Sequence, residues 1–401
     1  MIKFKEAQKI ILKNVRQLSL EKINISFVLG RILGENIYSN INIPPFSKSA
    51  MDGFAIRYKD IVDLNGKNCV SLKIIADLPA GKTFKRELKI GEAVRIMTGA
   101  PVPSGADIVV PIEDVQVDGF YVRILKTYKQ GTNIAPIGED VQKGELVMEK
   151  GSLLGPAHIG MFAALGKKEV KLYKKPYVAI LPTGSELVDI SKSLTKGKIR
   201  DSNSYSLNAQ VTEACAAPVK FPICRDVEEK LTREVQKGLK YDVLIVSGGI
   251  SVGDYDFVKR VFEKLKIKEI FWKVAIKPGM PVFFGKFKDK LVFGLPGNPV
   301  SVMVTYELFI RPALLLMMGR KDCFREEVSA VAKCEIKHKR GRLDFIRGNL
   351  NWHDGEYFVS PTGFQGSGVL KSMVQANSLI VIPENLDLIP AGTKVKVLKL
   401  K

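Results

Sequence analysis

The stretch Val243-Leu244-Ile245-Val246-Ser247-Gly248-Gly249 decides the fold of the largest part of this chain. It begins with an unbroken apolar run, which is typical of a strand buried on both faces of a parallel sheet. Residues 177–181 form a second such run and lead into Pro182-Thr183-Gly184. Helical patterns lie between the two runs, at residues 204–215 and 227–239. Strands that alternate with helices predict an α/β domain with a largely parallel sheet.

Three further helices are expected from the spacing of apolar residues. Residues 4–18 predict an amphipathic helix, and residues 28–33 predict a second, shorter one. Asn298 suits the position before a helix and Pro299 its first turn, so a helix is expected from there to about Met318.

The remaining segments indicate β structure. Short apolar runs between Gly, Pro and Asp turns, from about residue 50 to 140, predict a compact β-rich domain. Residues 326–401 predict a small barrel-like β domain. We therefore expect a multidomain α/β plus β protein with four domains: residues 1–24 with 176–325 (α/β), 25–45 with 141–175 (linking), 46–140 (β-rich) and 326–401 (C-terminal).

Composition excludes several classes of protein. The chain has 401 residues, is 46% hydrophobic and carries a net charge of +20. The densest basic stretch, residues 337–342, has no nucleic-acid-binding motif beside it, so we expect no nucleic acid. No apolar run approaches the roughly 18 residues that span a membrane, and no signal peptide opens the chain, so a cytoplasmic protein without a membrane segment is expected. The scattered cysteines and isolated histidines predict reduced thiols and argue against a zinc site.

Candidate ligand loops follow the predicted strands, because open α/β sheets bind ligands at the carboxyl ends of their strands. They are residues 182–186, 201–203, 247–254 and 295–301. In the third loop, glycines allow backbone N–H groups to approach an anion, and Ser247 and Ser251 add hydroxyl donors. The standard nucleotide fingerprints are absent, so this loop predicts a phosphate site of another kind or a simple turn.

Charged residues cluster near the same strand ends. In an extended segment, Lys273 and Lys277 would share one face and repel each other unless an anion lies between them; the alternative is two solvated lysines. Several carboxylates near these strand ends can ligate Mg²⁺ together with phosphate oxygens. They are Glu186, Asp201, Asp226, Asp254 and Asp256. Each of them alone is more often a helix cap or a surface charge. These residues predict an enzyme that binds a phosphorylated ligand with a divalent metal.

The order of the motifs resembles one family. The MoeA family, whose eukaryotic relative is the carboxy-terminal domain of gephyrin, is similar over nearly the whole chain. The motifs that carry the resemblance are residues 44–53, 97–101, 138–140, 182–187, 201–203, 247–253, 276–279 and 294–301. Eight motifs in register make the resemblance specific, although each alone is weak.

This resemblance implies an elongated homodimer of four-domain subunits that inserts molybdate into adenylated molybdopterin, with Mg²⁺, and releases AMP. It places the active site between the α/β domain of one subunit and the β-rich domain of the other, so that Asp52 and Thr98 reach across the interface. From pattern alone, the turns that contain these two residues are structural.

The resemblance also implies roles for individual residues. The expected catalytic residues are Asp52, Thr98, Asp140, Glu186, Asp226, Lys273 and Lys277. The expected substrate-binding residues are Asp201, Ser202, Asn203, Ser247, Gly248, Gly249, Ser251, Gly253, Pro296, Pro299, Ser301, Arg347 and Ser367. The expected metal ligands are Glu186, Asp226 and Asp256.

The expected substrates are adenylated molybdopterin and molybdate. The expected partners are the enzyme that adenylates the pterin and the molybdoenzymes that accept the product. Two alternatives stay open: a non-enzymatic molybdopterin-binding scaffold, and a different phosphoanhydride hydrolase on the same fold. Tungstate is also open as the oxyanion, because it is a tetrahedral dianion of similar size.

Overall fold

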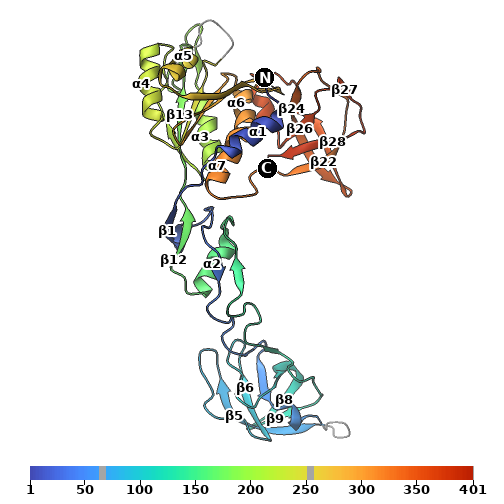
Figure 1. Ribbon diagram of the computed structural model, residues 1–401. Coiled ribbons are helices and arrows are strands. Elements are labelled where there is room, and N and C mark those ends of the chain that lie inside the picture. Colours follow the sequence, from blue (N-terminus) through green and yellow to red (C-terminus); the bar gives the residue numbers. More distant parts are fainter. Residues whose placement is uncertain (63–68, 251–256, 401) are drawn as a thin grey trace. The chain divides into compact units, whose positions relative to one another are not determined.

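A computed structural model describes residues 1–62, 69–250 and 257–400, and the chain divides into two compact units (Figure 1). Unit 1 comprises Met1–Gly34, Gly151–Leu154 and Val170–Lys401, and unit 2 comprises Glu35–Lys150 and Gly155–Glu169. The expected site residues Ser251, Gly253, Asp254 and Asp256 lie outside the described residues. The division into four domains is finer than these two units and stays a prediction.

Unit 1 contains the six-stranded sheet that the apolar runs predict. Its strands, in spatial order, are β16 (Ala217–Lys220), β13 (Tyr177–Pro182), β17 (Val243–Ser247), β21 (Lys290–Leu295), β20 (Pro281–Phe287) and β18 (Lys268–Lys273). The first four strands are parallel, and β20 is antiparallel to both of its neighbours. Pro182 pairs with Ser247, and Ser247 with Leu295, so the carboxyl ends of three strands are aligned.

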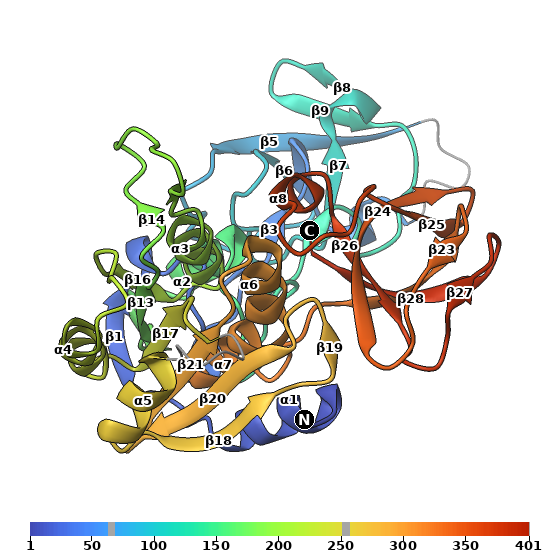
Figure 2. The ribbon, with the colours of Figure 1, turned by 90° about the horizontal axis from the view of Figure 1, so that it is seen from above.

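Helices cover both faces of this sheet (Figure 2). One face packs against α1 (Phe4–Lys13), α3 (Asn203–Glu213) and the continuous helical stretch α6 (Pro299–Thr305), η4 (Tyr306–Ile310) and α7 (Arg311–Met317). The other face packs against α4 (Glu228–Gly238) and α5 (Phe257–Lys264). Along β17, Val243 and Ile245 belong to the first core, whereas Leu244 and Val246 belong to the second. This alternation explains why the strand is apolar throughout.

The long helical stretch corrects one expectation from the sequence. Pro299–Met317 has the length and apolar composition of a membrane-spanning helix, so the chain does contain such a run. The stretch lies inside the fold, however, with 83% of its apolar window buried. Its π-helical middle, η4, carries the buried Glu307, which forms an ion pair with Arg325 at 2.9 Å. It is therefore a core helix of unit 1.

The C-terminal part of unit 1 is a closed five-stranded barrel, as predicted. Around the ring its strands are β24 (Leu343–His353), β25 (Glu356–Pro361), β22 (Glu327–Ala332), β28 (Lys394–Lys399) and β26 (Ser378–Ile382), which pairs again with β24. The short strand β19 (Ile276–Lys277) joins β24 from outside, with Lys277 opposite Asp344. A short helix, α8 (Leu370–Val374), precedes β26.

Unit 2 is built on a second six-stranded sheet. Its strands in order are β7 (Ile108–Pro111), β4 (Gly53–Ile56), β6 (Glu92–Ile96), β5 (Val70–Leu78), β9 (Tyr121–Ile124) and β8 (Val115–Asp118). Helix α2 (Pro156–Ala164) also belongs to this unit. The β-rich character expected for this region is confirmed.

Short pairs of strands complete both units. They are β1 (Leu20–Asn24) with β12 (Glu169–Tyr173), β2 (Ile37–Tyr38) with β11 (Leu146–Met148), β3 (Lys48–Ser49) with β10 (Ile134–Ala135), β14 (Leu187–Val188) with β15 (Ile199–Arg200), and β23 (Ile336–Lys337) with β27 (Leu388–Ile389). The prediction of a helix at residues 28–33 is wrong. A 3₁₀ turn, η1 (Ile25–Phe27), precedes this segment. Within it, Ile32 forms a bridge with Leu153, and Leu33 forms a bridge with Leu172.

Candidate functional site

Hydrogen bonds tie the loops at the carboxyl ends of the parallel strands to one another. The Thr183 N–H donates to the Ser247 carbonyl (2.9 Å), and the Gly248 N–H donates to the Leu295 carbonyl (3.0 Å). Gly248 has a φ of +102°, and a Cβ at this position would lie 2.1 Å from the Thr183 carbonyl oxygen. Only glycine fits this close approach, which favours the simple-turn alternative for Gly248, whose N–H is already used within the fold.

Asn203 links three of the predicted loops. Its Nδ2 donates to Ser247 Oγ (3.2 Å) and to the Gly297 carbonyl (2.8 Å). Its Oδ1 is buried and accepts no hydrogen bond from the part of the chain that the structure describes. A buried acceptor without a donor costs free energy, so this oxygen favours an N–H donor that the described residues do not supply.

Asp201 stabilises the beginning of α3. Its side chain is buried, and its carboxylate accepts hydrogen bonds from the Ser204 N–H (3.0 Å) and from the Ser204 hydroxyl. The carboxylate therefore lies at the start of the helix. There it accepts a hydrogen bond from a backbone N–H and interacts favourably with the positive end of the helix dipole. The neighbouring Ser202, in contrast, is exposed.

Asp226 and Glu186 both contact the loop after β13. Asp226 accepts hydrogen bonds from Thr183 Oγ1 (3.0 Å) and from the Ser185 N–H (2.9 Å). The Glu186 carboxylate folds over Gly184, where a Cβ would lie 2.7 Å from Oε1. Two of the three predicted metal ligands are thus brought to one loop.

The donor set of this loop suits Mg²⁺ held together with a phosphate. Mg²⁺ commonly uses one or two carboxylates, with the remaining ligands from water and phosphate. Asp226 keeps free lone pairs despite its two hydrogen bonds, because each carboxylate oxygen accepts more than one. The described residues contain no group of three or more potential metal ligands, and Asp256, the third predicted ligand, lies outside them.

The barrel also contributes to this edge of the sheet. Asn298, which precedes α6, donates from Nδ2 to Ser367 Oγ (3.0 Å), and the Val300 N–H donates to the Ser367 carbonyl (3.1 Å). The two predicted residues beside this contact are at least partly buried: Pro299 opens α6, and Ser301 lies in its first turn. Pro296 is also buried. The structure therefore brings Ser367 to the start of α6, as the predicted substrate site requires.

Arg347 contacts the same loop that carries Ser367. It is 1% exposed, and its guanidinium donates to Ser372 Oγ (3.1 Å) and to the Gly366 carbonyl (3.2 Å). Burial lowers the pKa of Arg347 from its usual value, and the nearby Asp344 opposes this. The guanidinium thus holds the loop that carries Ser367 and reaches no solvent.

Lys273 and Lys277 do not lie on one continuous strand, which corrects the expectation from the sequence. Lys273 ends β18, whereas Lys277 belongs to β19, and the Ile276 N–H donates to the Val274 carbonyl (2.8 Å) between them. This bond bends the chain, so the strict alternation of faces does not hold. Lys277 Nζ forms an ion pair with Asp344 Oδ2 at 3.1 Å.

Asp344 and His338 are residues that the motifs did not reveal. Asp344 is 3% exposed, and its Oδ2 also lies 3.1 Å from His338 Nδ1. A signal was present in the sequence, because Asp344 interrupts an otherwise apolar strand start. A charged residue at a buried strand position needs a partner, and that partner is Lys277.

In unit 2, Asp52 and Thr98 are in contact. Asp52 Oδ1 accepts hydrogen bonds from the Thr98 N–H and from Thr98 Oγ1, both at 2.7 Å. These hydrogen bonds lower the pKa of Asp52 below its usual value, and Arg95 adds a smaller effect in the same direction. Asp140 lies on another turn, where its N–H donates to the Ile43 carbonyl (2.9 Å), and its side chain is exposed.

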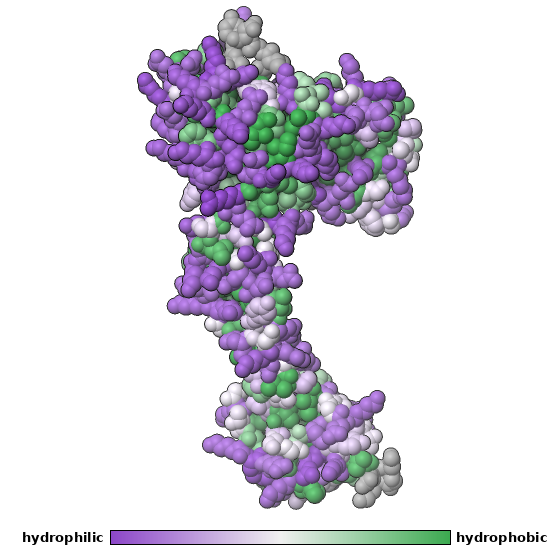
Figure 3. Space-filling model, viewed as in Figure 1, coloured by the Kyte–Doolittle hydropathy of each residue, from purple (hydrophilic) through white to green (hydrophobic). Residues whose placement is uncertain are grey.

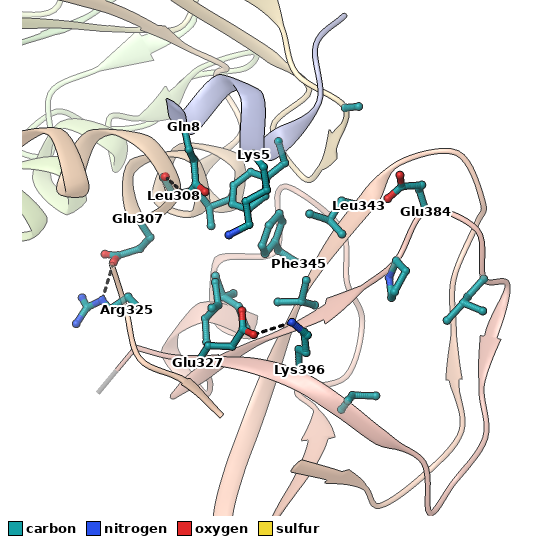
Figure 4. A pocket seen from close by; sticks show the side chains of 18 of the residues that line it. Lys5, Gln8, Glu307, Leu308, Arg325, Glu327, Leu343, Phe345, Glu384 and Lys396 are labelled. Carbon is teal, nitrogen blue, oxygen red and sulfur yellow. Dashed lines mark hydrogen bonds and ion pairs between the residues drawn. The ribbon is translucent and has the colours of Figure 1, made fainter. Parts of the chain in front are cut away.

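Unit 1 also contains a cavity of about 760 Å³ between α1 and the barrel (Figure 4). Lys5 of α1 points into it, and the ion pairs Arg325–Glu307 and Lys396–Glu327 lie on its wall. No predicted site residue lines this cavity. We therefore assign the site to the polar loops at the carboxyl edge of the sheet, where predicted residues of unit 1 converge.

The surface in Figure 3 is largely hydrophilic on both units, in keeping with the net charge of +20. A net charge does not by itself mark a binding face.

Comparison with known proteins gives consistent matches along the chain. Residues 2–166 match the MoeA N-terminal region (domain I and II), residues 179–315 match a probable molybdopterin binding domain, and residues 329–400 match the MoeA C-terminal region (domain IV).

Relatives and solved structures agree with these regions. The chain is 37% identical to the molybdopterin molybdenumtransferase of Haemophilus influenzae, over 94% of this chain and 93% of the relative. It is 34% identical to the Bacillus subtilis protein of the same name, over 96% of this chain and 91% of that one. A crystal structure of the molybdopterin biosynthesis moeA protein from Pyrococcus horikoshii OT3 is 32% identical, with a TM-score of 0.85, and both chains are covered completely. The chain therefore belongs to the MoeA family, an enzyme family of molybdenum cofactor biosynthesis.

Proposed function

We propose that this chain catalyses the insertion of molybdate into adenylated molybdopterin, with Mg²⁺, and releases AMP. The relatives that match nearly the full chain are named molybdopterin molybdenumtransferases, which supports the transferase class. The observation that carries the proposal is the convergence of the predicted residues on one edge of the sheet. Asn203 connects Ser247 with Gly297, and Asp226 anchors the loop before Glu186.

The chemistry suits a phosphorylated pterin. The Ser247–Gly249 segment offers the Ser247 hydroxyl and the Gly249 N–H to an anion. Ser251 and Gly253, which lie outside the described residues, are proposed to bind the same ligand. The buried Asn203 Oδ1 would accept an N–H of the pterin. Glu186, Asp226 and Asp256 would hold Mg²⁺, which supplies positive charge to the adenylate phosphate when bound.

Lysines would neutralise the oxyanion. Lys273 and Lys277 would bind molybdate and stabilise negative charge on the phosphoryl group, as cations do at such centres. A molybdate oxygen would attack the adenylate phosphorus, and the bond from that phosphorus to the oxygen of the pterin phosphate would break, which gives an adenylyl molybdate. The two dithiolene sulfurs would then bind molybdenum, and the bond from molybdenum to the adenylate oxygen would break, so that AMP leaves with that oxygen. Arg347 would act through the loop that carries Ser367, because its guanidinium donates to the Gly366 carbonyl.

We further propose a cytoplasmic homodimer. In it, Asp52, Thr98 and Asp140 of one subunit would approach the α/β domain of the other and orient or polarise the attacking oxyanion. The adenylating enzyme and the acceptor molybdoenzymes would be transient partners. The two hydrogen bonds from Thr98 support this role, because they hold the Asp52 carboxylate in a fixed position.

The test is AMP release from adenylated molybdopterin with molybdate and Mg²⁺. Lys277→Ala should lower the molybdate-dependent rate by about 100-fold or more, because one removed charge-stabilising donor typically costs that much. The dimer should stay folded, which size-exclusion chromatography and circular dichroism check. Unchanged kinetics would remove Lys277 from the mechanism.

The same assay separates the alternatives. No AMP release by the wild-type chain, combined with tight molybdopterin binding, would indicate a scaffold. Hydrolysis of ordinary dinucleotides without any molybdate requirement would indicate a phosphoanhydride hydrolase.

A further inference from the structure

The C-terminal barrel holds the segment that carries Lys277 through its backbone. Ile276 pairs with Leu343 and Lys277 with Asp344, in a short parallel ladder between β19 and β24. The Leu343 N–H also donates to the Ala275 carbonyl (3.1 Å). The main chain around Lys277 is therefore fixed by the barrel, although Lys277 itself precedes the barrel in sequence.

The side chain of Lys277 is fixed by the same strand. Lys277 Nζ lies 3.1 Å from Asp344 Oδ2, and the Lys277 side chain is 41% exposed while that of Asp344 is 4% exposed. An ammonium group has three N–H donors, so one donor to Asp344 leaves two for another ligand. The ion pair thus limits where the ammonium can lie without using up its capacity to bind an oxyanion.

The Asp344 side chain also contacts His338. The fully buried His338 side chain places Nδ1 3.1 Å from Asp344 Oδ2, the same oxygen that Lys277 contacts. An ionised carboxylate only accepts, so His338 Nδ1 is the donor. His338 Nε2 is buried and has no hydrogen-bond partner among the described residues, so the imidazole makes this one polar contact through its ring nitrogens.

We propose that Asp344, supported by His338, is a positioning residue that orients Lys277 toward the oxyanion. The inference rests on the proposed function, in which Lys277 binds molybdate. Asp344 also favours the charged form of Arg347, which holds the loop that carries Ser367, so one buried carboxylate acts on both side chains. The barrel then contributes to the reaction by setting the position of a lysine from another part of unit 1.

The experiment compares Asp344→Asn with Glu327→Gln. Both changes remove one carboxylate charge from a lysine ion pair of the barrel, but the Glu327–Lys396 pair is exposed and joins β22 and β28, neither of which pairs with β24. Removal of an outer partner of a functional group typically costs 10- to 100-fold, so Asp344→Asn should lower kcat for molybdate-dependent AMP release by about that factor. Glu327→Gln should leave kcat unchanged. Equal rates for the two variants would overturn the proposal.

A double-mutant cycle separates positioning from a general structural defect. In a Lys277→Ala background, Asp344→Asn should have little further effect on kcat, because the group on which it acts is gone. Additive losses would show that Asp344 acts independently of Lys277 and would contradict the proposal. His338→Gln should lower kcat in the same direction by a smaller factor, and it decides the matter if Asp344→Asn does not fold.

A measurement without turnover tests the restraint of Lys277 by Asp344 separately from the proposed function. An amine-reactive reagent should label Lys277 severalfold faster in Asp344→Asn than in the wild type, with Lys396 as the internal reference, followed by mass spectrometry. If the wild type releases no AMP, the proposed function fails, but the labelling still shows whether Asp344 restrains Lys277. Unchanged labelling of Lys277 would overturn the restraint itself.

Discussion

The carboxyl edge of the six-stranded sheet and the Asp52 turn of unit 2 hold their polar side chains in different ways. At the sheet edge, Asp201 is buried and accepts two hydrogen bonds at a helix start. In unit 2, Asp52 is exposed, and both of its hydrogen bonds come from one neighbour, Thr98. The first arrangement is part of the packed core, whereas the second is a local turn. Polar residues at the sheet edge should therefore affect folding and function together, and those in the turn should affect function almost alone.

The largest effect is expected for Gly248→Ala. The new Cβ would lie 2.1 Å from the Thr183 carbonyl oxygen, on a backbone whose φ is +102°. Overpacking and an unfavourable φ each cost about 1–3 kcal/mol, so the free energy of unfolding should fall by roughly 3 kcal/mol or more. Urea denaturation measures this change.

Gly297→Ala is the matched control for that variant. Gly297 lies on a neighbouring loop of the same edge, but a Cβ there would have no heavy atom within 4 Å. Its unfolding free energy should stay within about 0.5 kcal/mol of the wild type. A similar loss in both variants would mean that the sheet edge is not packed as described.

A smaller loss is expected for Asp201→Ala. The change leaves the buried Ser204 N–H and hydroxyl without their acceptor, which should destabilise the fold by about 2 kcal/mol. Thermal unfolding followed by circular dichroism checks this.

Asp189→Ala provides the comparison for Asp201. Asp189 makes the same kind of contact, to the Ser191 N–H (2.9 Å) and Ser191 Oγ (2.7 Å), but in an exposed turn. Its loss should cost less than about 0.5 kcal/mol. If the two variants melt alike, burial does not distinguish the two aspartates.

The smallest effect on stability is expected for Thr98→Val in unit 2. Without the Thr98 hydroxyl, the pKa of Asp52 should rise toward its ordinary value of 3.8. A carboxylate with a lowered pKa contributes stability above its ordinary pKa, and this contribution is lost as the pH falls through the lower value. The wild type and the variant should therefore differ slightly at pH 7 and become equally stable in strong acid.

Titration of the Asp52 carboxyl carbon by NMR measures that pKa directly. Thr132→Val is the control, because the Thr132 hydroxyl donates to the Lys129 carbonyl in the same unit and leaves Asp52 untouched. An unchanged Asp52 titration in Thr98→Val would show that the backbone N–H of Thr98 alone sets this pKa.

Much of the α/β fold could be predicted because its strands are buried on both faces. The run at Val243–Ser247 is apolar at every position before the serine, and the structure divides these residues between two cores. The helix expected at residues 28–33 was wrong because helical spacing of apolar residues does not exclude strand-like bridges, which Ile32 and Leu33 form with distant partners. Local spacing carries no information about those partners.

The candidate site shows the same limit. Its loops could be predicted because the ends of parallel strands meet at one edge. The Lys277–Asp344 contact could not, since it joins two strands separated in sequence by the whole core helix. The bend between Lys273 and Lys277 was also missed, because a single backbone hydrogen bond from Ile276 to Val274 produces it.

The closure of the barrel has a consequence for solubility. In an open sheet, the outermost strands present unpaired N–H and C=O groups that can template pairing with another chain. The second pairing of β24, with β26, closes the ring, so each of its five strands has a neighbour on both sides. The strand that holds Asp344 beside Lys277 thus belongs to a sheet that offers little opportunity for aggregation through its edges.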